Sequence, residues 1–294
     1  MIDQSKISII LPCYNESDNL LDFLPMLCKK FEQSEIIVVD DGSTDNSYEI
    51  AKTFPVKIIR HPRNIGNGAS IKSGARVAKN SYLVFMDSDG QHNPEDISLL
   101  VEKLEQGYDM AIGARRPNSH ASLSRYTANK FYNKLASFMT GFKIDDLTSG
   151  LRAAKANKFR KFIYLLPNGF SYPTTSTMAF FRSGFAIAYV PISTATRKGS
   201  SKIKLIKDGT RFFIIILKVG ALFSPMRFFL PISIFFFFTG FFYYIYTYIE
   251  QGRFTNMSAL LIITSVLTFL IGIVSEQISS LHYRHAEDNS NDNE

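Results

Sequence analysis

The sequence contains no tryptophan and only two cysteines among its 294 residues. Two cysteines cannot build the dense disulfide framework of a small secreted domain, so Cys13 and Cys28 are interpreted as ordinary apolar residues. Hydrophobic residues make up 46% of the chain and charged residues 20%. This composition is too apolar for a disordered chain and too charged for one embedded wholly in a membrane. We therefore expect a soluble part joined to a hydrophobic part.

Acidic residues are missing from one long segment. Residues 147–207 contain eleven lysines and arginines and no aspartate or glutamate. Residues 197–227, which overlap the end of this segment, carry eight basic groups and one acidic group, and we call them the basic segment. Residues 228–294, in contrast, have a net charge of −4. The overall net charge of +7 therefore reflects a local excess, which suits an anionic partner. Lys155, Lys158 and Lys161 are interpreted as facing anionic lipid.

Two long runs near the C-terminus contain no charged residue. Residues 228–249 form a run of 22 and residues 257–275 a run of 19, and roughly 20 apolar residues in a helix cross a bilayer core. The alternative, a pair of buried core helices, is disfavoured because the first run offers no polar face to water. We expect a transmembrane hairpin over 227–276.

The basic segment sets the expected orientation of this hairpin. It carries many more Lys and Arg residues than the hairpin loop, so the positive-inside rule places it and both termini in the cytoplasm of a two-span membrane protein. Residues 201–226 are expected to form an amphipathic juxtamembrane helix beside anionic headgroups of the lipid bilayer. No signal peptide is recognised before the first strand, and the tail 277–294 is expected to be a disordered cytoplasmic segment.

The first 200 residues alternate between short apolar runs and helical patterns, which predicts an α/β domain. The predicted strands are 7–11, 36–39, 56–59, 82–86 and 109–113, and the predicted helices are 17–31, 45–54, 67–79 and 94–106. Such alternation favours a three-layer sandwich around a mainly parallel sheet, with ligands beyond the carboxyl ends of the strands. The polar stretch 169–177 is interpreted as a loop without an assigned role.

Carboxylates gather where these strands end. Asp40 and Asp41 follow the second strand, and Asp87 and Asp89 follow the fourth. Two carboxylates spaced two residues apart share a face in an extended segment and suit a hard divalent cation or a nucleoside. Each motif alone is weak because Asp and Gly are common in turns, but their joint arrival at strand ends is specific. Asn67-Gly68 could let the backbone approach a ligand or form a simple helix start.

Seven motifs together resemble one family. They are PCYNE at 12–16, VDDGSTD at 39–45, NIGNGASIKSG at 64–74, MDSDGQH at 86–92, GAR at 113–115, DLTSGLR at 146–152 and RKGSSK at 197–202. The chain resembles inverting glycosyltransferases of family 2 with a GT-A (Rossmann-like) fold, in the branch of dolichyl/polyprenyl-phosphate sugar synthases with two C-terminal spans. The resemblance covers about residues 5–225. Ser88 and Ala114 depart from the usual pattern without changing a charged group.

The resemblance implies roles for individual residues. The implied nucleotide contacts are Pro12, Tyr14, Glu16, Asp40 and Asp87, and the implied ligands of Mg²⁺ or Mn²⁺ are Asp87, Asp89 and Gln91. The implied acceptor or diphosphate contacts are Arg115, Arg125, Ser149, Arg197 and Lys202. Asp89, Asp146 and Arg197 are the implied catalytic residues, with Asp146 either orienting the acceptor, acting as base or merely capping a turn. His92 is open between a packing role and an active one.

The implied reaction transfers one sugar from a UDP- or GDP-sugar to a polyprenyl phosphate, undecaprenyl or dolichyl, with inversion. The alternatives are an inactive scaffold that binds nucleotide-sugar and a transferase that uses another lipid acceptor. A processive polysaccharide synthase is excluded, because its Q-x-x-R-W motif needs the missing tryptophan. Nucleic acid is not expected as a partner, because the basic excess adjoins two membrane spans. A homo-oligomer is left open.

Overall fold

The computed structural model describes residues 2–115, 123–169, 171–193 and 224–291, apart from the side chains of 123–126, 128 and 282–291. Among these residues, seven strands form one sheet in the order β3-β2-β1-β4-β6-β5-β7. The strands are β1 (Ile7–Cys13), β2 (Glu35–Asp40), β3 (Lys57–Arg60), β4 (Tyr82–Phe85), β5 (Met110–Arg115), β6 (Arg152–Lys155) and β7 (Ile187–Ile192). Of these seven strands in the described part of the chain, only β6 pairs antiparallel, with β4 and β5. The predicted mainly parallel sheet is confirmed, and β6 and β7 are additions to it.

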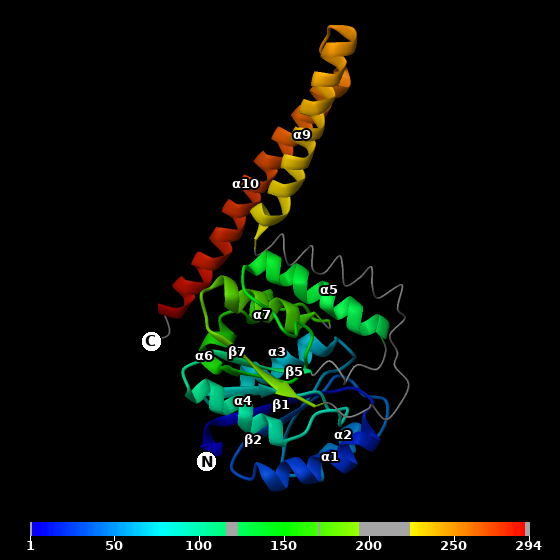
Figure 1. The fold of residues 1–294 in the computed structure, drawn as a ribbon. Helices are drawn as coiled ribbons and strands as arrows, with labels where there is room; N and C mark the ends of the chain where they lie inside the picture. The colour runs from blue at the N-terminus through cyan, green and yellow to red at the C-terminus, as the bar shows by residue number, and fades with distance from the viewer. Residues whose placement is uncertain (1, 116–122, 170, 194–223, 292–294) are drawn as a thin grey trace. The chain divides into compact units, whose positions relative to one another are not determined.

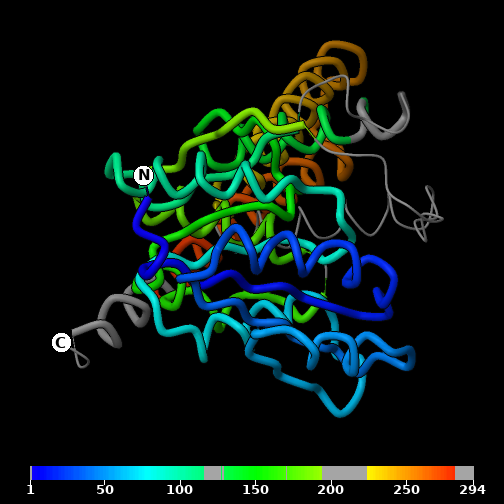
Figure 2. Tube along the Cα trace, turned by 90° about the horizontal axis from the view of Figure 1, so that it is seen from below, coloured from blue at the N-terminus to red at the C-terminus, as the bar shows by residue number. Residues whose placement is uncertain are grey.

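Helices cover both faces of this sheet, as Figure 1 shows. The helices of this part are α1 (Ser17–Lys30), α2 (Ser47–Ala51), α3 (Asn67–Val77), α4 (Glu95–Glu105), α5 (Leu123–Thr140), α6 (Ala156–Arg160) and α7 (Tyr172–Arg182), with 3₁₀ turns η1 (Gln4–Lys6) and η3 (Ile163–Leu165). Helices α1 and α4 pack on the face formed by Ile7, Ile9 and Leu11. They lie side by side in Figure 2 and are joined by the Lys30–Glu95 ion pair.

The opposite face of the sheet packs against α3, α6 and α7. Gly74 of α3 lies against Ile10, and the rings of Phe85 and Phe159 lie 4.5 Å apart between β4 and α6. Helices therefore occupy the layers above and below the sheet. The predicted three-layer sandwich is confirmed.

Helix α7 corrects the interpretation of residues 169–177 as a loop. Residues Tyr172–Arg182 are helical, and Tyr172 to Phe181 are all buried. Serine and threonine have weak helix propensity, which suggested a loop, but here their hydroxyl groups bond to carbonyls one turn earlier. Thr177 Oγ1, for example, donates to the Pro173 carbonyl at 2.8 Å. Pro173 in the first turn was the signal for a helix start.

The chain divides into two compact units, and the second contains residues 135–142 and 213–294. Its helices α9 (Pro225–Gln251) and α10 (Asn256–Asn291) form an antiparallel hairpin. Small residues repeat every seven positions along the buried seam, at Ser233, Gly240 and Thr247 on α9 and at Ser258, Ser265, Gly272 and Ser279 on α10. Ser233 Oγ donates to the Ser265 carbonyl at 3.0 Å, and Ser265 Oγ donates to the Ser233 carbonyl at 2.9 Å. The seam lets the two backbones approach closely.

Both hairpin helices meet the length and composition of a membrane span. The most apolar stretch of 18 residues has a mean hydropathy of 1.9 in Pro225–Gln251 and of 2.5 in Asn256–Leu281. Large apolar side chains such as Phe235 and Ile249 are exposed on the outside of the pair. The predicted disorder of 277–294 is wrong as far as Asn291, because α10 continues to that residue. Extending an existing helix needs no new nucleation. The juxtamembrane helix predicted over 201–226 lies outside the described residues up to 223.

Candidate active site

The loops after β1 and β2 are fastened to each other at the carboxyl edge of the sheet. The Asn15 amide donates to Ser43 Oγ at 3.0 Å, and the Thr44 amide donates to Asn15 Oδ1 at 2.8 Å. Asn15 has φ +54°, a left-handed conformation that asparagine tolerates better than most residues. Two sequence motifs whose bonded residues are 28 and 29 positions apart therefore form one rim.

Asp40 ends β2 and is 1% exposed. Its Oδ1 accepts the Ser43 amide at 3.1 Å. Its Oδ2 lies 3.2 Å from Arg60 Nε, but the geometry is that of an ion pair without a hydrogen bond. Ser43 and Arg60, which both contact this carboxylate, also line a hollow of about 530 Å³ together with Gly42, Thr44, His61 and Pro62. The arrangement suits a nucleobase or ribose that donates a hydrogen bond to Oδ2.

Asp41 has a structural task instead. Its oxygens accept the amides of Ile65 at 3.0 Å and Gly66 at 2.7 Å, and its Oδ1 lies 2.7 Å from His61 Nδ1. His61 Nε2 in turn lies 2.9 Å from Ser73 Oγ on α3. Asp41 thus fixes the loop that leads into α3.

The start of α3 answers the question left open about Asn67-Gly68. The amides of Gly68 and Ala69 donate to the carbonyls of Gly169 and Asn168 at 3.2 and 3.1 Å. A Cβ at position 68 would collide with the Pro167 carbonyl. Glycine is therefore needed here because the chain's own 167–169 loop approaches, and these two amides are already occupied.

Asp87, Asp89 and Gln91 follow β4, and all three are half-buried. The backbone amide of Gln91 donates to Asp89 Oδ1 at 3.2 Å and closes a tight turn through Gly90, which has φ +70°. Gly150 lies so close to Asp87 that an added Cβ would collide with Oδ2. The DSD and DLTSG motifs, about 60 residues apart, therefore meet at one carboxylate.

Asp146 and Arg115 form a two-pronged ion pair. Arg115 Nε donates to Asp146 Oδ2 at 2.8 Å, and Nη2 donates to Oδ1 at 2.9 Å and to Thr148 Oγ1 at 2.6 Å. Burial would raise the pKa of Asp146, but the hydrogen bonds and charge of Arg115 outweigh it and lower that pKa. Asn133 of α5 holds the same loop through Asp145 and Leu147. Asp146 is ionised and firmly positioned.

Buried polar atoms without a hydrogen-bond partner gather near this edge. In the described part of the chain they are Asp40 Oδ2, Asn67 Oδ1, Ser70 Oγ, His92 Nδ1 and Tyr189 Oη. Burial lowers the pKa of His92 to about 4 despite the nearby charge of Asp89, so its imidazole is neutral at pH 7. Unsatisfied buried groups are rare in folded proteins and often mark the place of a ligand, water or ion.

The other residues of the expected site differ in exposure and in their contacts. Pro12 is buried within β1, and its carbonyl accepts Ser88 Oγ at 2.8 Å. Ser149 is 1% exposed, whereas Tyr14 is 39% exposed at the rim. Glu16 lies at the start of α1 and accepts a hydrogen bond from Asn19. The side chain of Arg125, and all of Arg197 and Lys202, lie outside the described residues, so their roles stay predictions.

The interpretation of Lys155 and Lys158 as lipid-facing residues is wrong. Both donate to Asp109 Oδ1, at 3.1 and 2.7 Å. They lie at the amino edge of the sheet, because β6 runs antiparallel to its neighbours. Asp109 lies outside the acid-free segment in the sequence, but in the folded chain its negative charge neutralises two of the lysines of that segment.

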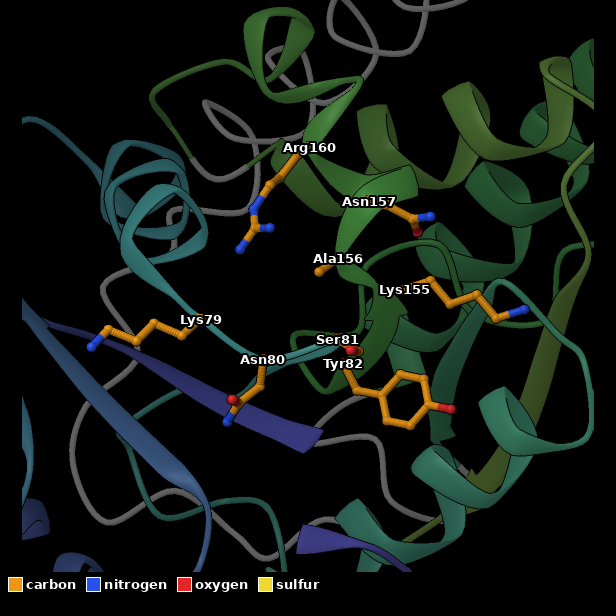
Figure 3. A pocket seen from close by; sticks show the side chains of 8 residues that line it. All are labelled: Lys79, Asn80, Ser81, Tyr82, Lys155, Ala156, Asn157 and Arg160. Carbon is orange, nitrogen blue, oxygen red and sulfur yellow. The ribbon is translucent and has the colours of Figure 1, made fainter. Parts of the chain in front are cut away.

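Another pocket, of about 390 Å³, lies at this amino edge between the start of β4 and the end of β6. Figure 3 shows that Lys79 and Lys155 point away from each other there. Arg160 donates to the carbonyls of Ala75 and Ala78 at the end of α3. The basic side chains that line this pocket do not point toward a common point, and we assign the pocket no ligand.

Comparison with known proteins identifies the family. A model described as glycosyl transferase family 2 matches residues 8–163, more than half of the chain. The chain belongs to this family. A second model, described as the GtrB C-terminal hairpin, matches residues 224–281 of this family 2 glycosyltransferase and covers both apolar helices.

Several relatives are similar in sequence. An uncharacterized protein of Methanocaldococcus jannaschii is 34% identical over 66% of this chain and 83% of its own. The undecaprenyl-phosphate 4-deoxy-4-formamido-L-arabinose transferases of Photorhabdus laumondii and Yersinia pestis are 37% and 35% identical, over 50% and 58% of this chain. This glycosyltransferase spans only 48% and 58% of those two relatives, so about half of their length.

Solved structures confirm the GT-A fold. Glucosyl-3-phosphoglycerate synthase from Mycobacterium tuberculosis superposes with a TM-score of 0.61 at 19% identity, over 73% of this chain and 80% of that one. That structure contains Mn²⁺, UDP and glucosyl-3-phosphoglycerate. At this identity the likeness establishes the architecture alone.

The residues present fit a divalent cation. The described residues contain no group of three or more His, Cys, Asp and Glu side chains that could hold a metal by themselves. Asp87, Asp89 and Gln91 contribute two carboxylates and one amide oxygen to this edge, and Mg²⁺ commonly binds through one or two carboxylates plus substrate phosphates. The Asp87 carboxylate lies directly against Gly150, which blocks it on that side. A cation shared with a diphosphate therefore suits this donor set.

Proposed function

We propose that this glycosyltransferase transfers one sugar from a nucleoside diphosphate sugar to a polyprenyl phosphate, with inversion at the anomeric carbon. The observation that carries the proposal is the meeting of Asp87 and the DLTSG loop, beside the Arg115–Asp146 pair, in a chain with two membrane-length helices. The naming of relatives as undecaprenyl-phosphate sugar transferases supports the acceptor class.

The donor would lie across the carboxyl edge. Asp40 Oδ2 is placed to accept a hydrogen bond from the nucleobase or ribose, and the exposed ring of Tyr14 offers a surface for stacking. Asp87, Asp89 and Gln91 would hold Mg²⁺ or Mn²⁺ against the diphosphate. When bound, the cation neutralises charge on the departing nucleoside diphosphate. Arg197 and Lys202 are proposed to add positive charge to the same group.

In the proposed reaction an oxygen of the acceptor phosphate forms a bond to the anomeric carbon. The bond from that carbon to the diphosphate breaks, and its electron pair leaves with the nucleoside diphosphate. A phosphate monoester is anionic at neutral pH, so the nucleophile needs little help from a base. Asp146, ionised and gripped by Arg115, would therefore orient cationic groups around the acceptor rather than remove a proton.

The proposed architecture follows the boundaries expected from the sequence. Residues 1–200 form the catalytic domain, 201–226 the basic juxtamembrane part and 227–276 the membrane hairpin. The polyprenyl tail would stay in the bilayer while its phosphate reaches the site. We propose that the catalytic domain and both termini lie in the cytoplasm, because the basic segment adjoins the first span.

The test is transfer of a labelled sugar to undecaprenyl or dolichyl phosphate by the purified full chain. A panel of UDP- and GDP-sugars with Mn²⁺ or Mg²⁺ identifies the donor, and EDTA should abolish transfer. Asp89→Ala should lose activity while it keeps the wild-type melting temperature. Full activity of that variant, or of the metal-free protein, would overturn the metal assignment.

A second acceptor class is tested in the same assay. Transfer to diacylglycerol or another lipid but not to a polyprenyl phosphate would replace the acceptor in the proposal. Binding of a nucleotide-sugar without transfer to any lipid would favour the inactive scaffold.

A further inference from the structure

Arg152 is a buried cation that the proposed reaction does not use. It is the first residue of β6, it is 0% exposed, and it is the largest fully buried side chain among the described residues. Strand β6 places it opposite Phe85, two residues before Asp87. A buried charge is costly unless nearby groups compensate it, so its surroundings need an explanation.

The guanidinium is held by neutral oxygens on two sides. Nη2 and Nε donate to the Ser149 carbonyl at 2.7 and 3.3 Å. Nη1 donates to the Pro173 carbonyl at 2.9 Å, to Ser176 Oγ at 2.9 Å and to Thr177 Oγ1 at 3.2 Å, all on α7. Arg152 therefore ties the DLTSG loop to the first turns of α7.

The negative charges that favour the Arg152 cation belong to the candidate site. No ion pair to Arg152 is formed by the carboxylates of the described residues, but Asp146 and Asp87 both interact with it electrostatically. Arg152 is connected to Asp87 through the backbone. It donates hydrogen bonds to the carbonyl of Ser149, and the next residue is Gly150. Gly150 in turn abuts the Asp87 carboxylate. Tyr172 Oη of α7 donates to the Gly150 carbonyl at 3.4 Å and supports the same position.

We propose that Arg152 is a positioning residue for the cation and diphosphate site: by holding the Ser149 carbonyl it keeps Gly150 against Asp87 and so fixes the direction of that carboxylate. This inference rests on the proposed function, since it assigns Asp87 to the cation. A metal ligand whose orientation is fixed by neighbouring groups binds its ion more tightly than one that must be ordered on binding.

The rival explanation is that Arg152 only stabilises the fold, and two control variants represent it. Thr177→Val removes a buried hydroxyl from the α7 side of the guanidinium and leaves the Ser149 carbonyl in place. Arg160→Gln removes a more exposed arginine that also donates to two main-chain carbonyls, but at the amino edge of the sheet. Both controls should lower the melting temperature and leave Mn²⁺ binding within twofold of the wild type.

The experiment measures Mn²⁺ binding to the detergent-solubilised full chain by electron paramagnetic resonance, with UDP and with GDP in separate titrations. Arg152→Gln should raise the Mn²⁺ dissociation constant about tenfold or more. Gly150→Ala, which displaces Asp87 without touching Arg152, should do the same. Arg152→Lys keeps the charge but cannot grip both sides, so an intermediate shift is expected, and this variant decides if Arg152→Gln does not fold.

The outcomes separate the two proposals. If the wild type transfers sugar and binds Mn²⁺, but the folded Arg152 variant keeps the wild-type dissociation constant while its melting temperature falls as in the controls, the positioning role is overturned alone. If the wild type neither binds Mn²⁺ with either nucleotide nor transfers sugar, the proposed function fails first.

Discussion

At the scale of single residues, Asp40 and Asp41 show how one residue type takes two tasks. The side chain of Asp40 keeps an oxygen without a hydrogen bond next to Arg60, which lines a hollow, whereas both oxygens of Asp41 accept backbone amides of the loop before α3. Both are almost fully buried. The sequence motif indicated that both belong to the nucleotide end of the domain, but only the folded loops decide which carboxylate can meet a ligand.

Asp146 is the residue for which the structure narrows the alternatives most. Its lowered pKa means that it stays ionised well below neutral pH, so its protonation does not change between pH 5 and 8. Arg115 occupies both of its oxygens. These observations favour an orienting role over that of a base, and the Thr148 amide, which donates to Asp146 Oδ1 at 3.1 Å, fits the turn-cap alternative as well.

We predict that Asp146→Asn lowers kcat/KM about 100-fold, because misplacing a catalytic group by about 1 Å can cost that much. The shape of the pH–rate profile between pH 5.5 and 8 should match that of the wild type. Asp145→Asn is the matched control, since Asp145 pairs only with the exposed Lys143 among the described ion pairs, and it should stay within twofold. A loss in Asp146→Asn that disappears at high pH would assign a base instead.

At the scale of elements, the hairpin depends on small residues at its seam. A Cβ at Gly240 would lie 2.9 Å from Leu261 Cβ and 3.1 Å from Ile262 Cγ1. The repeat of Ser, Gly or Thr at every seventh position is present in the sequence, but the apolar runs around it predicted only that the helices span a membrane. Their pairing and register follow from this seam.

We predict that Gly240→Leu separates the two helices and destabilises the hairpin by about 1–3 kcal/mol, the usual cost of overpacking. Thermal unfolding in detergent measures the loss. The neighbouring Thr239 is exposed, so Thr239→Leu adds the same side chain outside the seam and should leave the melting temperature almost unchanged. Equal effects of the two variants would contradict the seam.

The amino edge of the sheet is held by Asp109. Burial would raise the pKa of this carboxyl, but Lys158, the Ala186 amide and Lys155 together lower it. A carboxyl with a lowered pKa in the folded state stabilises the protein above its unfolded pKa, and this contribution disappears as pH falls through the folded pKa.

We predict that Asp109→Asn lowers the free energy of unfolding by about 2 kcal/mol at pH 7, the scale of hydrogen bonds to a charged group. The difference from the wild type should shrink as pH falls below about 4, where the carboxyl of the unfolded chain becomes protonated, and should disappear as pH falls through the lowered pKa of the folded state. Glu49→Gln breaks an exposed pair with Lys52 and serves as control, with little change expected. A difference that stays constant down to pH 3 would contradict the role of the charge.

At the scale of the whole molecule, charge and hydrophobicity are separated along the chain. The hairpin helices carry an apolar outer surface, and the connector between them contains Arg253 as its basic residue. The basic segment on the other side of the first span holds eight basic groups. This asymmetry supports the proposed topology.

We predict that a cysteine at Arg253→Cys reacts with a membrane-impermeant maleimide in intact cells, while one at Ser290→Cys reacts only after permeabilisation. Cys28 is replaced by serine in both variants, and the buried Cys13 is left in place. Labelling of the tail in intact cells would reverse the proposed orientation.

The sequence by itself determined the parts whose signals are local. Short apolar runs predicted five strands, and polar residues before helical patterns predicted where helices begin. The two uncharged runs predicted two helices long enough to span a membrane. Motifs at strand ends marked the carboxyl edge as the site, because parallel strands all end there. The family match confirms the resemblance on which the individual roles were based.

Only the tertiary structure decided how distant residues meet. Strand β6 is short, and its antiparallel insertion between β4 and β5 places Arg152 opposite Phe85, two residues before Asp87, and brings Lys155 to Asp109. Helix α7 was not predicted because serine and threonine have weak helix propensity, whereas burial of the whole segment Tyr172–Phe181 stabilises the helix in the folded protein. Pairings of this kind depend on register and burial, which local propensity does not encode. The sequence therefore indicated which residue types form the site, whereas the tertiary structure determined which of them are in contact.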